Sequence, residues 1–190
     1  KFYYSKILGI REPEIEQEGA LDNRTYGNVY HRSAELIYQK IMDKNNVVSK
    51  ESIEKIRKSR ATIELCVDEA FSELIFKTTS SKYRPKYNGL QLVNRESIIN
   101  YLIKMLQQDE KSAPITIKGL ELRINSEISF ISNNEKRSLT IKGFIDRLDE
   151  VCHESEGRMI RVIDYKTGRP SLKQPKDIED VFNRTKIHET

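Results

Sequence analysis

Residues 143–149 read Gly-Phe-Ile-Asp-Arg-Leu-Asp, and residues 162–168 read Val-Ile-Asp-Tyr-Lys-Thr-Gly. Each stretch runs from apolar residues into charged ones, which is typical of a strand that reaches the edge of a sheet. Positions two apart on a strand point to the same face, so Asp164 and Lys166 are expected to project together. Asp146 stands 18 residues before Asp164. Two adjacent strands with a short connection would bring both carboxylates to one end of the sheet.

These charged side chains suit phosphodiester chemistry. A carboxylate holds a hard cation through oxygen, and an ammonium group beside it can lie near the attacking water or the scissile phosphate. Asp146 and Asp164 are therefore candidate Mg²⁺ or Mn²⁺ ligands, and together with Lys166 they form the candidate catalytic set. An isolated Asp-x-Lys is more often an ordinary ion pair at a strand end. The presence of both stretches, in this order, favours catalysis.

Two other residues of the first stretch have their own interpretations. Gly143 would leave space beside the metal and the substrate backbone. Asp149 competes with Asp146 as the first carboxylate, but a role as a surface partner for Arg147 or Arg158 is favoured.

The sequence before residue 114 predicts helices, because apolar or small residues recur there every three or four positions. Short polar residues that precede such runs are candidate helix caps. The expected elements, with candidate caps in parentheses, are a helix over 26–41 (Asp22 or Thr25), one helix ending at 74 (Ser49 or Ser52), a loop over 77–90, and a helix over 98–106 (Asn94).

After residue 114 the apolar residues alternate with polar ones, which indicates half-buried strands. Leu120, Leu122 and Ile124 begin this pattern, and Asn133-Asn134 would form the turn to the next strand. Further strands are expected over 139–148 and 159–165. The chain is therefore expected to form one α/β domain, which has three parts: a mostly helical part (1–113), a sheet with the charged motifs (114–168) and a polar tail (169–190).

Together, the two quoted stretches resemble the PD-(D/E)XK nuclease superfamily, and specifically its RecB/AddB-type branch. That branch carries a Gly-x-Ile-Asp-Arg-x-Asp strand followed by an Asp-Tyr-Lys-x-Gly strand, which match residues 143–149 and 164–168. It also places a metal-binding histidine after a Gly-x-x-x-His segment in its first helix, and His31 after Gly27 matches that pattern. The resemblance implies a restriction-endonuclease-like fold, with N-terminal helices followed by a mixed, mainly antiparallel central sheet.

The resemblance also implies metal-dependent cleavage of DNA. In that scheme His31, Asp146, Asp164 and the backbone carbonyl of Tyr165 hold Mg²⁺ or Mn²⁺. Lys166 orients the attacking water or stabilises the charge that develops on the phosphate. The chemistry of His31 agrees, since a neutral imidazole can complete the coordination of a divalent cation. A lone histidine beside an apolar stripe would more often be a packing residue.

Two acidic residues are weaker candidates for the same site. Glu35 lies one helical turn after His31, and Glu121 sits on the polar side of the first strand. Each is a candidate extra ligand, but a solvated carboxylate is the favoured interpretation, so neither joins the catalytic set.

The sequence departs from this branch in two places. The branch has a Gln-x-x-x-Tyr helix after the lysine strand, whereas Gln174 is followed four residues later by Ile178. We therefore expect a fragment that stops early, which would be inactive by itself if the missing helix contributes to the site. Some members bind an iron–sulfur cluster, but Cys66 and Cys152 have no such spacing and no cluster is evident. Cys66 is expected to be a reduced thiol in the core.

Bulk properties agree with a nucleic-acid enzyme without proving one. The net charge is +4, and a mild basic surplus is compatible with a polyanionic partner. No apolar run is long enough for a membrane span, and a cytoplasmic location is expected. The leading hypothesis is a DNA nuclease, exonuclease rather than endonuclease, that works with a helicase subunit or a fused helicase domain in double-strand-break repair. The alternative is a non-catalytic DNA-binding or scaffold module that retains the fold.

Overall fold

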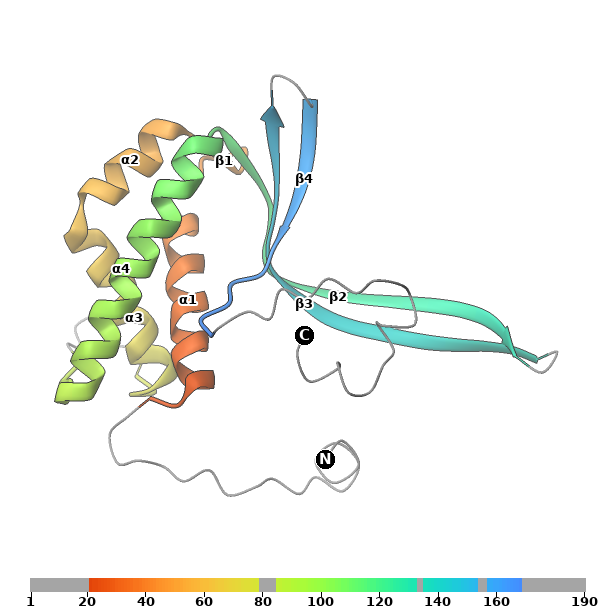
Figure 1. Cartoon of the computed structure of the whole chain (residues 1–190), viewed down its shortest axis with the longest axis horizontal. Coiled ribbons are helices and arrows are strands. Elements are labelled where there is room, and N and C mark those ends of the chain that lie inside the picture. The colour runs from red at the N-terminus through yellow and green to blue at the C-terminus, as the bar shows by residue number, and fades with distance from the viewer. Residues whose placement is uncertain (1–20, 79–84, 133–134, 154–156, 169–190) are drawn as a thin grey trace.

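The computed structural model describes residues 21–78, 85–132, 135–153 and 157–168 (Figure 1). A group of helices lies beside a sheet whose central hairpin extends well beyond them. The helices are α1 (Asn23–Ile41), α2 (Lys50–Lys58), α3 (Arg60–Leu74) and α4 (Gly89–Ser112). The strands are β1 (Val47–Val48), β2 (Ile115–Ser132), β3 (Glu135–His153) and β4 (Gly157–Ile163).

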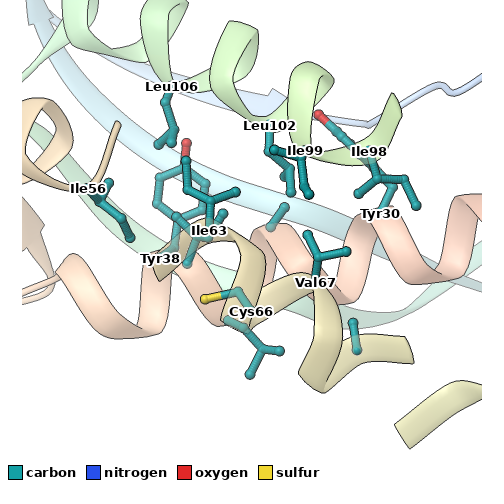
Figure 2. Packing of buried hydrophobic residues seen from close by; sticks show 14 of the residues in the cluster. Tyr30, Tyr38, Ile56, Ile63, Cys66, Val67, Ile98, Ile99, Leu102 and Leu106 are labelled. Carbon is teal, nitrogen blue, oxygen red and sulfur yellow. The ribbon is translucent and has the colours of Figure 1, made fainter. Parts of the chain in front are cut away.

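The apolar stripes of the helices form the core, as their spacing predicted. The inner faces of α1, α3 and α4 meet in one cluster of buried side chains, shown in Figure 2. Tyr38 of α1, Val67 of α3 and Leu102 of α4 are each fully buried there. Cys66 is a buried free thiol of the same cluster, as expected. Burial raises the pKa of the Cys66 thiol to about 11, which keeps this thiol protonated at neutral pH.

The helix boundaries differ from the prediction in two places. The expected single helix up to residue 74 is two helices, α2 and α3, which meet at Ser59. The Ser59 amide donates to the carbonyls of Lys55 and Ile56, and its hydroxyl lies 2.7 Å from the Thr62 hydroxyl. Such local hydrogen bonds let a serine end one helix and start another.

Helix α4 begins earlier than expected. Asn88 caps it, accepting from the Gln91 amide at 2.9 Å, and Gln91 completes a capping box. Asn94, the expected cap, therefore lies inside α4. Residues 89 and 90, the last two of the expected loop over 77–90, belong to the helix. For α1 the cap is Asp22, one of the two candidates, which accepts from the Thr25 amide at 2.8 Å.

The sheet has the order β1-β2-β3-β4, and all of its described pairings are antiparallel. The fold is thus the expected α/β, restriction-endonuclease-like one, with no parallel pair among the described strands. β2 and β3 are longer than predicted, and the far part of their hairpin extends away from the helices (Figure 1). The expected turn at Asn133-Asn134 and the tail over 169–190 lie outside the described residues. Within the described part, no helix has the length and hydropathy of a membrane span.

Candidate metal centre

Three ligand-type side chains from three elements meet where the helices face the sheet. They are His31 of α1, Glu121 of β2 and Asp146 of β3, and their ligand atoms all lie within 4.8 Å of one another. His31 Nδ1 is 3.4 Å from Asp146 Oδ1 and 3.8 Å from Glu121 Oε1. One imidazole nitrogen and two carboxylates form a donor set that fits a divalent cation such as Mg²⁺ or Mn²⁺. The helix motif and the first strand motif therefore meet as predicted.

The backbone of Tyr165 orients two of these three side chains. Its carbonyl lies 2.8 Å from His31 Nε2, and because a carbonyl can only accept, Nε2 is the donor. In a neutral imidazole the Nδ1 lone pair then faces the two carboxylates. The Tyr165 amide donates to Asp146 Oδ2 at 2.6 Å, which leaves Oδ1 toward His31. A histidine that gives its second N–H to a carbonyl is the usual arrangement around a bound metal.

This geometry sharpens the expectation for the Tyr165 carbonyl. The sequence predicted it as a direct metal ligand, whereas here it accepts the hydrogen bond that positions His31. Its role as a ligand stays a prediction.

Glu121 belongs to the cluster, although the sequence favoured a solvated role for it. Its backbone has a φ of 47°, in the left-handed region that a side chain with a Cβ rarely adopts. Such a conformation costs on the order of 1 kcal/mol and is common at functional sites. Partial burial, and then the nearby charge of Asp146, raise the pKa of Glu121. The alternation along β2 did make Glu121 a candidate, but it could not predict the strand register, which sets Glu121 opposite Asp146 between the pairs Leu120–Arg147 and Leu122–Ile145.

Glu35, the other weaker candidate, is engaged elsewhere. Arg32 Nη1 donates to one of its oxygens at 2.7 Å and Gln39 donates to the other at 3.0 Å. It is not a member of the His31 cluster.

Asp164 and Lys166 lie together but outside the three-residue cluster. Lys166 Nζ is 3.0 Å from Asp164 Oδ2, and both side chains are more than half exposed. The last pair of the β3–β4 ladder is Arg147 with Ile163, so Asp146 and Asp164 are the next residues beyond it. Their backbones are neighbours, as expected, but the buried Asp146 side chain contacts His31 while Asp164 contacts Lys166.

Arg147 and Asp149, which follow Asp146 in β3, are buried and form ion pairs within the protein. Arg147 is 1% exposed and donates two hydrogen bonds to Asp109 of α4, at 2.8 and 2.9 Å. Arg147 Nε also forms an ion pair with Asp149 at 2.9 Å, and Arg161 of β4 binds the same carboxylate at 2.7 and 3.0 Å. Asp149 does pair with Arg147, but the expected surface position is wrong, since Asp149 is fully buried.

Gly143 has open space around it, and its role beside the metal and the substrate stays a prediction. A Cβ built at this position would meet no atom within 4 Å, so packing within the described residues does not demand a glycine there.

Comparison with known proteins agrees with this arrangement. One relative, a subunit of an ATP-dependent helicase/deoxyribonuclease from Alkaliphilus metalliredigens (strain QYMF), is 25% identical to this chain over 170 residues. The aligned part is 88% of this chain and 14% of that relative, so the chain spans only a small part of its length. The family model of the PD-(D/E)XK nuclease superfamily matches residues 1–184. The chain therefore belongs to the PD-(D/E)XK nuclease superfamily.

Proposed function

We propose that this chain is the nuclease domain of a DNA-repair enzyme and hydrolyses phosphodiester bonds with the help of a divalent cation. The observation that carries the proposal is the orientation of His31 and Asp146 by the backbone of Tyr165. This geometry directs one nitrogen and one carboxylate oxygen at the same point, beside Glu121. Such pre-orientation is what a metal-dependent site needs from its protein.

Each residue of the site has a definite task in this proposal. His31 Nδ1, Asp146 and Glu121 would hold the cation, which when bound supplies Lewis acidity and an activated water. Asp164, one residue beyond the ladder, would add a third carboxylate to the metal site. Lys166 would bring its ammonium group to the scissile phosphate and stabilise the charge that develops there. The catalytic set therefore remains Asp146, Asp164 and Lys166, with Glu121 added to the metal ligands.

The relative supplies the finer part of the proposal. Its name describes a component of a helicase that is also a deoxyribonuclease. By analogy we propose DNA as the substrate, a helicase subunit or fused helicase domain as the partner, and action on DNA ends rather than at internal sites. Mg²⁺ is the proposed cation, with Mn²⁺ as a substitute, because two carboxylates and an imidazole accept either.

Cleavage of linear DNA tests the proposal directly. The full-length protein is incubated with end-labelled single-stranded and duplex DNA in Mg²⁺, in Mn²⁺ and in EDTA. We expect cleavage only with metal, and a loss of at least about 100-fold in Asp146→Ala and Asp164→Ala. Glu127→Gln, which removes an exposed carboxylate further along β2, is the matched control and should cleave normally. Equal rates for Asp164→Ala and wild type would contradict the proposed catalytic set.

A non-catalytic DNA-binding or scaffold module is the second candidate. The separation of Asp164 and Lys166 from the His31 cluster favours it. Calorimetric titration with Mn²⁺ distinguishes the two functions. A nuclease should bind Mn²⁺ through His31 and lose that binding in His31→Ala, whereas a scaffold should bind no Mn²⁺ above background.

A further inference from the structure

A pocket lies beside Tyr165, which is one of its lining residues. It has a volume of about 460 Å³, and its walls are one face of α4 and residues 164–168. Tyr101, Lys104 and Met105 line it from α4, and Tyr30 lines it from α1. The volume is in the range of pockets that hold one small organic group, such as a nucleotide. Because Asp164 and Lys166 are part of its wall, anything held in this pocket lies next to the proposed catalytic residues.

The α4 wall of the pocket carries an aromatic ring beside a positive charge. Tyr101 is 50% exposed, and Lys104 Nζ lies 5.8 Å from the centre of its ring. An exposed ring can stack on a nucleobase, and a neighbouring ammonium group can bind the phosphate that flanks the base.

The charges in the pocket favour an anionic ligand. Asp164 supplies the carboxylate among the lining residues. The ammonium group of Lys166 lies 3.0 Å from that carboxylate and offsets its negative charge. Lys104 then gives the lining a net positive charge. The ion pair with Lys166 offsets the charge of the Asp164 carboxylate, so this carboxylate does not exclude a phosphate at Lys104.

We infer that this pocket binds one nucleotide of a single-stranded DNA, with the base on Tyr101 and a phosphate at Lys104. A single strand is required, because the faces of bases in a duplex are already covered by their neighbours and cannot reach a tyrosine ring. Stacking on one ring is tolerant of sequence, so the pocket would accept any base. The inference rests on the proposed function, because it places this nucleotide beside the bond that Asp164 and Lys166 would act on.

Binding without cleavage tests the inference separately from catalysis. Anisotropy of a fluorescent oligo(dT) of about ten nucleotides is measured in EDTA with the full chain. We expect Tyr101→Ala to raise the Kd roughly 5- to 30-fold and Tyr101→Phe, which keeps the ring, to bind normally. Lys104→Gln should weaken binding about 3- to 10-fold. It should also lower the slope of log Kd against log salt by about 0.7, as expected for the loss of one phosphate contact.

Matched substitutions elsewhere exclude a general effect of charge or ring removal. Lys44→Gln removes an exposed lysine between α1 and β1, and Phe130→Ala removes a 46% exposed ring from the far hairpin. Both should bind oligo(dT) as the wild type does. Thermal melting of every variant establishes that each is folded. Equal losses in the controls, or a Tyr101→Ala variant that binds like the wild type, would overturn the inference.

Two further measurements separate this inference from the proposed function. A blunt duplex should be insensitive to Tyr101→Ala, and an equal loss for the duplex would overturn the single-strand assignment. In cleavage assays Tyr101→Ala should raise KM with little change in kcat. If the wild type cleaves DNA and Tyr101→Ala binds normally, the inference is wrong and the nuclease proposal stands. If no protein cleaves but Tyr101 and Lys104 still govern binding, the nuclease proposal fails and the pocket stands.

Discussion

The backbone of Tyr165 shows how one residue can organise a site without using its side chain. Its carbonyl fixes His31 and its amide fixes Asp146, so a shift of this backbone would move two proposed ligands together. The sequence predicted His31 and Asp146 from motifs, because side-chain identity carries that signal. It also named the Tyr165 carbonyl, as a metal ligand. It could not predict the two hydrogen bonds of this backbone to His31 and Asp146, since every residue has the same carbonyl and amide.

Glu121 is the member of the cluster whose removal should have opposite effects on stability and on metal binding. Without a cation, its carboxylate faces that of Asp146, and the two like charges repel each other. Glu121→Gln removes that repulsion. Since Glu121 is about one third exposed, solvent screens the effect, and we expect a gain of about 1–2 °C in the melting temperature in EDTA. The same change should weaken Mn²⁺ binding roughly 10- to 100-fold.

Glu127→Gln is the control for that experiment, because it removes a carboxylate from the same strand outside the cluster. It should alter neither the melting temperature nor the Mn²⁺ affinity. A Glu121→Gln protein that melts lower in EDTA, or that binds Mn²⁺ as the wild type does, would argue against a role for Glu121 at the metal.

For the helices, the sequence predicted which side chains face the core better than it predicted the residues at which each helix begins and ends. The periodic positions of α1, α3 and α4 are buried as expected, because burial depends on the repeat and not on any single residue. The residues at which a helix begins and ends depend on whether local side-chain and turn hydrogen bonds replace those of the helix. Ser59 divides one periodic run into α2 and α3 through hydrogen bonds to neighbouring groups, and the recurrence of apolar residues continues across it.

The start of α4 offers a comparison between two asparagines in one helix. Asn88 is the cap, while Asn94 is inside the helix and partly buried. Asn88→Ala should lower the free energy of unfolding by about 1 kcal/mol, because a backbone amide loses its acceptor. Asn94→Ala should change it by less than about 0.5 kcal/mol, since alanine is the better helix former. Urea unfolding followed by circular dichroism measures both. The reverse order would show that α4 starts at Asn94, as the sequence alone suggested.

Over the whole chain, the fold was predictable and the assembly of the site was predictable only in part. The change from helical to alternating periodicity near residue 114 separated the helices from the three long strands correctly, but the short strand β1 at Val47–Val48 was not predicted. His31 and Asp146 came from motifs and do meet. The place of Glu121 depends on the register of β2 on β3, and the separation of Asp164 depends on where the β3–β4 ladder ends. Both are properties of the folded backbone, and no residue pattern in a single sequence records them.

A buried charge network joins the helices to the sheet. Arg147 of β3 contacts Asp109 of α4, which also accepts from the Tyr38 hydroxyl of α1. Asp149 and Arg161 extend the network to β4. Arg147 follows Asp146 in β3, so the network ties the strand that carries Asp146 to α1 and α4. Nothing in the motif Gly-x-Ile-Asp-Arg-x-Asp by itself reveals that its arginine and second aspartate are internal.

Removing one partner from this network should destabilise the whole domain. Asp109→Ala leaves the Arg147 guanidinium buried with one carboxylate fewer, and we expect a loss of about 3–5 kcal/mol, or on the order of 10 °C in melting temperature. The double variant Asp109→Ala with Arg147→Met should lose clearly less than the single one, because no unpaired charge remains and Arg161 still neutralises Asp149. Glu96→Ala breaks the half-exposed Arg60–Glu96 pair and is the control, with an expected cost below about 0.5 kcal/mol. A double variant that is less stable than Asp109→Ala would mean that Arg147 stabilises the domain by packing rather than by its charge.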